Sequence, residues 1–173
     1  KLYKKSILEK YDIQFDRRYS ILEDSTFVLN YLQYTKHICC LSMVGYHYRQ
    51  LNEESLVKKY NENELEAYKT RSYAAASLEK LLNNENKYFY DTSVFNELWG
   101  ILPKLYYRSG LSSKQKKNET IKFLNSEYVQ SVCKKADFLY CNTSQKIKLI
   151  LCKNKCWLGV FILLSAMKAI RNK

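Results

Sequence analysis

Two adjacent carboxylates, Glu23 and Asp24, stand directly before an apolar pattern with helical spacing. The pattern predicts a helix that begins here, with Asp24 as its N-cap. The free N–H groups and the dipole of a helix N-terminus stabilise a carboxylate, so Asp24 can act as a general base towards a hydroxyl group. Asp is also among the commonest N-caps, and a purely structural role is the alternative interpretation.

Further candidates follow in the chain. Residues 38–48 are rich in residue types that favour strands, and they lead to Arg49 and then to Ser55. An arginine can hold a phosphate group through two hydrogen bonds, and a serine hydroxyl can add a third. A surface arginine at the end of a strand is also a common structural feature, so this second observation leaves two interpretations open.

Five short motifs occur in a fixed order around the carboxylate pair. They are a basic segment, an extended Ile-x-Phe-Asp, the Glu-Asp pair, a Tyr-x-Tyr-Arg and a Ser-Leu, at residues 1–5, 13–16, 23–24, 46–49 and 55–56. This ordered set resembles the closing third of the catalytic domain of the family 2 glycosyltransferases. The match covers roughly the first third of the chain. It therefore implies that the chain begins inside its own catalytic domain.

The resemblance implies an inverting enzyme of cell-surface polysaccharide or glycolipid synthesis. Such an enzyme moves a sugar from a nucleotide-sugar donor to a glycan or lipid-linked acceptor. Asp24 would be the catalytic base, with Glu23 supporting it. Arg49 and Ser55 would lie near the diphosphate of the donor.

Two more residues near the arginine are candidates for the same diphosphate site. Related enzymes often place a histidine a few residues after the arginine, where this chain has Asn52, and its side-chain amide would take that role. His47 precedes the arginine, which favours a structural role over binding. Asp16 is expected to be a turn carboxylate paired with a neighbouring arginine, and the rim of the acceptor site is its alternative role.

The chain contains no Asp-x-Asp motif and no glycine-rich nucleotide fingerprint. Enzymes of the family bind their nucleotide on an N-terminal half, where an Asp-x-Asp motif holds a divalent metal. The resemblance thus implies that the full-length enzyme uses Mg²⁺ or Mn²⁺. This part of it is expected to hold no metal and to be inactive alone.

Glycine and proline are scarce, with four and one in 173 residues, which indicates long helices. The sequence predicts a mainly α protein in two parts. Residues 1–56 are expected to be mixed α/β, with a strand pair near 38–48, and the resemblance implies that they are the remnant of a GT-A catalytic domain. Residues 57–173 are expected to form a helical bundle. Its helices are predicted at residues 62–82, 91–107 and 112–133 and after a cap at 142–144, with a polar break at 83–87.

The net charge is +12, from 29 basic and 17 acidic residues. The lysines are dispersed and no recognised nucleic-acid motif accompanies them, so the charge disfavours nucleic acid as a partner. Six cysteines without a Cys-x-x-Cys pair indicate free thiols in a reducing cytoplasm. The expected location is therefore the cytoplasm, or the inner face of the cell membrane.

The apolar run at residues 156–167 is shorter than the roughly 20 residues that cross a bilayer. A buried last helix is the favoured interpretation, and peripheral membrane contact through residues 153–173 is the alternative. The alternative to an enzyme is accordingly a non-catalytic, basic helical module that docks on a membrane or a partner. A nucleic-acid-binding helical domain is a further rival.

Overall fold

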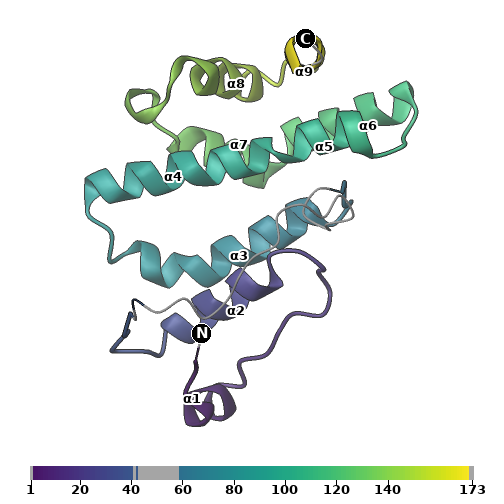
Figure 1. Cartoon of the computed structure of the whole chain (residues 1–173). Helices are drawn as coiled ribbons and strands as arrows, with labels where there is room; N and C mark the ends of the chain where they lie inside the picture. Colours follow the sequence, from purple (N-terminus) through teal and green to yellow (C-terminus); the bar gives the residue numbers. More distant parts are fainter. Residues whose placement is uncertain (1, 41, 43–58, 172–173) are drawn as a thin grey trace. The chain divides into compact units, whose positions relative to one another are not determined.

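The computed structural model describes residues 2–40, 42 and 59–171, and its regular elements are all helical in this part of the chain (Figure 1). The mainly α prediction is confirmed. The elements are α1 (Lys5–Lys10), α2 (Glu23–Leu32), α3 (Glu64–Glu79), α4 (Asn84–Trp99), α5 (Ile101–Arg108), α6 (Ser113–Asn125), α7 (Glu127–Lys135), the 3₁₀ helix η2 (Phe138–Tyr140), α8 (Thr143–Lys153) and α9 (Trp157–Arg171).

The predicted α/β remnant is not supported, because the described residues contain no strand. Within the segment 38–48, residues 38–40 and 42 are described and have no regular structure, and the others lie outside the described residues. Strand-forming residue types express their preference on a half-buried, pleated surface. Ile38 is 71% exposed, and Cys39 and Cys40 are exposed as well, so this condition is not met.

The chain divides into two compact units. The first comprises residues 1–59 and 66–81, and the second comprises residues 60–65 and 82–173. The boundary expected between residues 56 and 57 stays a prediction, because the segment 43–58 around it lies outside the described residues.

The first unit has a small aromatic core between α1 and α2. Ile13, Phe27 and Tyr31 are buried, and the ring of Tyr3 meets both Phe27 and Tyr31 edge-on, at centroid distances of 5.1 and 4.9 Å. The Tyr31 hydroxyl accepts a hydrogen bond from the backbone N–H of Lys4 at 2.9 Å. This contact satisfies a polar group that burial would otherwise leave unpaired.

The second unit is built around α4, whose start was predicted wrongly. Asn83 caps this helix by accepting a hydrogen bond from the backbone N–H of Asn86, so the expected polar break at 83–87 is helical from Asn84 onwards. Asp91 and Thr92, where the sequence predicts the start of a helix, are instead buried within α4. Asp91 is tolerated there because the ammonium of Lys87 lies 3.4 Å from its carboxylate, one helical turn away.

Several helix ends follow the sequence more closely. Capping boxes form between Ser112 and Gln115 and between Asn142 and Gln145, which confirms the helix start expected at residue 112 and the cap expected at 142–144. The single helix expected over 112–133 is wrong, however. Ser126 has the extended ψ of 127° and separates α6 from α7.

The turn between α5 and α6 contains Gly110, whose φ of +67° lies in the left-handed region. It follows the end of α5 at Arg108, close to residue 107, where the sequence predicts that a helix ends. The Ser109 hydroxyl donates a hydrogen bond to the carbonyl of Leu105 and accepts one from the backbone N–H of Leu111. The turn is therefore fixed by its own hydrogen bonds as well as by the glycine.

The last helix, α9, is buried along one stripe only. Val160 and Leu164 are fully buried, and the Tyr107 hydroxyl of α5 donates a hydrogen bond to the carbonyl of Leu164. Leu158 and Ile162, by contrast, are more than half exposed. The expectation of a buried last helix thus holds for one of its faces. Within the described residues, no helix is both long and apolar enough to cross a membrane.

An ion pair lies inside the second unit. The Glu64 carboxylate, with 2% of its side chain exposed, accepts a hydrogen bond of 2.5 Å from the Lys104 ammonium of α5. Burial raises the pKa of Glu64, and the contact with Lys104 opposes that rise. One carboxylate oxygen, Oε2, has no hydrogen-bond partner in the described part of the molecule. The pair is thus formed at a desolvation cost that only Lys104 offsets.

We predict that Lys104→Met lowers the free energy of unfolding by roughly 3 kcal/mol, because it leaves a buried carboxylate without a counter-charge. The double variant Glu64→Gln/Lys104→Met should recover most of this loss. Lys122→Met is the matched control, since its pair with Glu119 is exposed and worth less than about 1 kcal/mol. Urea titration measures all three, and equal losses for the two lysine variants would contradict the prediction.

The loss should also depend on pH. A raised pKa means that the folded protein favours the protonated form of Glu64. The stability that this preference contributes is fully present below the ordinary pKa of a glutamate, and it is lost as the pH rises through the raised pKa of the folded state. Lys104→Met removes the lysine that opposes this rise in pKa. The loss of stability of this variant relative to the wild type should therefore be smaller in acid, where Glu64 is protonated. Unfolding titrations at pH 4 and pH 7 test the sign.

Candidate functional site

The structure describes two of the six residues predicted to form the site. Glu23 and Asp24 are the first two residues of α2, with Asp24 exposed and Glu23 half-buried. The predicted diphosphate-binding residues lie outside the described residues: Arg49, Ser55, Asn52 and His47.

The prediction that Asp24 is the N-cap of this helix is wrong. Leu22 occupies the N-cap position in a left-handed conformation, with φ 62°, and no side chain caps the helix. The carbonyl of Leu22 accepts hydrogen bonds from the Thr26 backbone and from the Ser25 hydroxyl, both at 2.9 Å. The helix therefore starts two residues earlier than predicted and carries both carboxylates inside its first turn.

The left-handed conformation of Leu22 is strained. A residue with a Cβ pays about 1–2 kcal/mol for it, whereas glycine does not. The burial of Ile21 and Phe27 on either side fixes the path of the chain and offsets this cost. Backbone strain of this kind is concentrated at functional sites. The strained residue lies immediately before the two candidate side chains, Glu23 and Asp24.

The carboxylate of Asp24 is held at one oxygen. Oδ1 accepts a hydrogen bond of 2.6 Å from the backbone N–H of Ser25, and Oδ2 has no hydrogen-bond partner in the described part of the chain. The charge of Asp24 reaches the neighbouring core. Burial is the main reason that the pKa of Tyr3 is raised, and Asp24 is the next. The side chain is thus oriented, exposed at one oxygen and close to an aromatic cluster.

A polar pocket of about 490 Å³ lies elsewhere in the first unit. The loop 11–18 forms one wall, and Thr26, Asn30 and Gln33 of the α2 region form another. Asp24 is not among the residues that line it. The sequence analysis missed this pocket, although the spacing of the three polar residues places them on one helical face.

Asp16 lies at the edge of this pocket and is paired with Arg18. Its carboxylate accepts hydrogen bonds from the Arg18 backbone N–H at 3.1 Å and from the guanidinium Nη2 at 2.6 Å. The side-chain hydrogen bond from Arg18 is the main reason that the pKa of Asp16 is lowered. This geometry matches the turn carboxylate that the sequence predicts.

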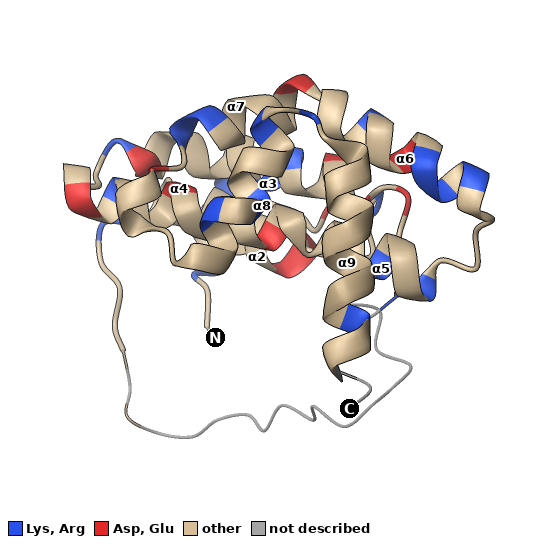
Figure 2. Cartoon of the chain, turned by 90° about the horizontal axis from the view of Figure 1, so that it is seen from above, with Lys and Arg blue, Asp and Glu red and all other residues tan. Residues whose placement is uncertain are grey.

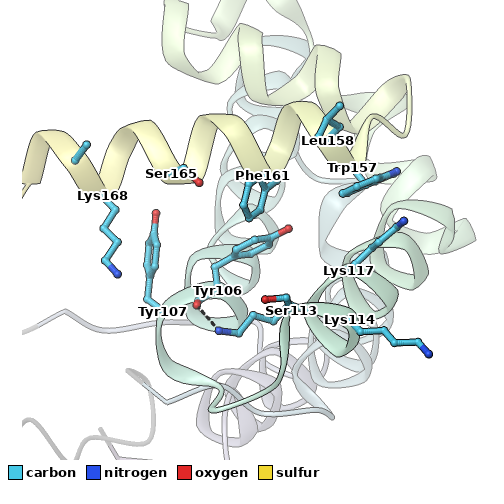
Figure 3. Close-up of a pocket in the computed structure, with 12 residues that line it drawn as sticks. Tyr106, Tyr107, Ser113, Lys114, Lys117, Trp157, Leu158, Phe161, Ser165 and Lys168 are labelled. Carbon is cyan, nitrogen blue, oxygen red and sulfur yellow. Dashed lines mark hydrogen bonds between the residues drawn. The ribbon is translucent and has the colours of Figure 1, made fainter.

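A second pocket, of about 770 Å³, lies between α5, α6 and α9 (Figure 3). Its wall combines aromatic rings with lysines, and sequence analysis did not identify it. The available signal was the pair Tyr106-Tyr107 followed by a lysine-rich helix start. The lining residues are Tyr106, Tyr107, Ser113, Lys114, Lys116, Lys117, Trp157, Leu158, Phe161, Ser165, Lys168 and Ala169.

Within the described residues, no group of three or more His, Cys, Asp or Glu side chains could hold a metal ion. The buried thiols of Cys133 and Cys152 share a hydrogen bond and are free cysteines. Neither observation places a cofactor in the described part of the chain.

Comparison with known protein families, with curated proteins and with solved structures finds no match to this chain.

We predict that Arg18→Met raises the pKa of Asp16 towards its ordinary value, because the hydrogen bond that favours the ionised form is lost. A lowered pKa contributes stability that is present above the unfolded-state pKa and is lost as the pH falls through the folded-state value. The variant should therefore show less loss of stability in acid than the wild type.

Carboxyl resonances followed by NMR across the acid range measure this change. Arg17→Met is the matched control, because this neighbouring arginine makes no recorded contact with Asp16 and should leave the titration unchanged. An Asp16 titration that is identical in all three proteins would contradict the assignment.

Proposed function

We propose that this chain is the C-terminal part of an inverting glycosyltransferase, with Asp24 as the general base. The enzyme would move a sugar from a nucleotide-sugar donor to a glycan or lipid-linked acceptor. The resemblance of the first third of the chain to family 2 glycosyltransferases supports the proposal. The observation that carries it is the carboxylate of Asp24, oriented through Oδ1 in the first turn of α2 and exposed.

The chemistry of an inverting transfer suits this carboxylate. An acceptor hydroxyl loses its proton while its oxygen attacks the anomeric carbon, and the base must hold the proton with a fixed geometry. The Ser25 N–H fixes one oxygen of Asp24, which leaves Oδ2 to accept the proton. The carboxylate also lies at the positive end of the α2 dipole, which attracts negative charge.

The remaining functional groups would come from segments outside the described residues. Arg49 and Ser55 would bind the diphosphate, assisted by Asn52 and, on the alternative interpretation, by His47. A divalent metal, Mg²⁺ or Mn²⁺, would stabilise the leaving diphosphate in the full-length enzyme. Such an enzyme would act in the cytoplasm or at the inner face of the cell membrane.

The test is the variant Asp24→Asn in the full-length protein. We expect a fall in turnover of roughly 10²- to 10⁴-fold, the range that a general base contributes, with an unchanged circular dichroism spectrum. Release of nucleoside diphosphate from a panel of nucleotide sugars, with a mixed glycan acceptor, measures turnover. Glu23→Gln should cause a smaller fall, because its proposed role is to support Asp24.

Glu9→Gln is the matched control, since Glu9 is an exposed carboxylate of α1 that pairs with Lys5. Its turnover should equal that of the wild type. The proposal fails if Asp24→Asn retains the activity of this control, or if the wild-type protein releases diphosphate from none of the donors. In either case the non-catalytic helical module becomes the better account of the chain.

A further inference from the structure

The pocket between α5, α6 and α9 is positively charged. Among the described residues, four lysines and no acidic side chain line it. Two of these lysines are held in place. The Lys116 ammonium donates a hydrogen bond of 2.9 Å to the carbonyl of Tyr106, and the Lys117 ammonium lies 4.3 Å from the centre of the Trp157 ring (Figure 3). The pocket therefore has a fixed cationic wall that suits an anion.

The other two lysines, Lys114 and Lys168, are exposed and make no recorded ion pair with a described residue. They come from different helices, α6 and α9, and flank the same pocket. Because no described carboxylate of the pocket wall neutralises them, a ligand that carries negative charge complements the site. A phosphate group meets this requirement, since ammonium groups bind its oxygens through charge-assisted hydrogen bonds.

An apolar surface continues from the pocket along α9. Leu158 and Phe161 line the pocket and are 51% and 46% exposed, and Ile162 and Ile170 further along the helix are 59% and 75% exposed. Large apolar side chains gathered on one helical face indicate a surface that another apolar phase covers. The surface of a phospholipid bilayer combines these two features, because its phosphate groups lie next to an apolar interior.

The charge of this region favours a membrane over a second copy of the chain. Residues 138–173 contain no Asp and no Glu, and Figure 2 shows no acidic residue on α9. Two copies that met through this face would place lysines against lysines. A bilayer with anionic headgroups instead offers opposite charge and an apolar interior together. The Trp157 ring is occupied by Lys117, which disfavours base stacking by a nucleic acid.

We propose that this face is a peripheral docking site for an anionic phospholipid bilayer. Lipid phosphates bind along the lysine-lined wall of the pocket, which includes Lys114 and Lys168, and the side chains of Leu158, Phe161 and Ile162 enter the boundary of the acyl chains. The site lies wholly within the second unit and does not depend on Asp24 or on sugar transfer.

The first experiment is co-sedimentation of the full chain with vesicles. Binding is expected with phosphatidylcholine vesicles that contain a quarter phosphatidylglycerol, and little or none with pure phosphatidylcholine. Each lysine near an anionic surface contributes roughly fivefold in affinity, so Lys114→Gln/Lys168→Gln should weaken binding by roughly 25-fold. Phe161→Ser should weaken it by tenfold or more, because an apolar side chain no longer enters the bilayer.

The matched control is Lys134→Gln/Lys146→Gln, which removes the same charge from exposed positions of α7 and α8 outside the pocket. If this control loses as much affinity as the pocket variant, the net charge of the protein explains the binding and the proposal fails. Equal binding to both kinds of vesicle also overturns it. If a free DNA oligonucleotide displaces the protein from the vesicles, and Phe161→Ser binds the vesicles as well as the wild type does, the face binds nucleic acid and the proposal fails.

Fluorescence gives a second, independent readout. The chain has two tryptophans, of which Trp99 is buried and Trp157 lines the pocket. In Trp99→Phe the emission of Trp157 should shift to the blue on addition of anionic vesicles, and brominated lipids should quench it. An unshifted, unquenched Trp157 in a folded protein that still sediments with the vesicles would show that another face binds.

Discussion

The burial of one face of α4 is the constraint on which the second unit depends. Val94, Phe95 and Leu98 are almost completely buried, and α7 packs along this helix. After Gly100 the chain continues into α5, where Ile101 and Leu102 remain in the same core. Because these apolar residues fix the position of α5, they also determine where its polar and aromatic side chains lie.

The eight residues of α5 connect the interior of the unit with its surface. On the inner side, Lys104 neutralises the buried Glu64 at the start of α3. On the outer side, Tyr106 and Tyr107 form a wall of the lysine-lined pocket, and Tyr107 binds the backbone of α9. A short helix held so firmly at its inner side can position a surface site accurately.

The parts of the fold that could be predicted from the sequence were those set by local chemistry. Ser112 and Asn142 cap helices because their side chains satisfy nearby N–H groups, and three-residue spacing makes such caps visible. Asp91 and Leu22 could not be predicted in the same way. The buried setting of the first and the left-handed backbone of the second depend on tertiary packing. Both pockets likewise combine residues from elements distant in sequence, and the proposed site residues 47–55 fall outside the described part of the chain.

The turn at residues 109–112 has a consequence for binding at the surface beyond it. Gly110 takes a backbone conformation that few residues adopt, and the Ser109 hydroxyl closes the turn, so α5 and α6 are joined by a short and internally bonded connection. A ligand that enters between these helices does not have to order a long loop first. The conformational entropy of this connection is already lost when the protein folds, so a larger part of the free energy of the ligand contacts appears as affinity.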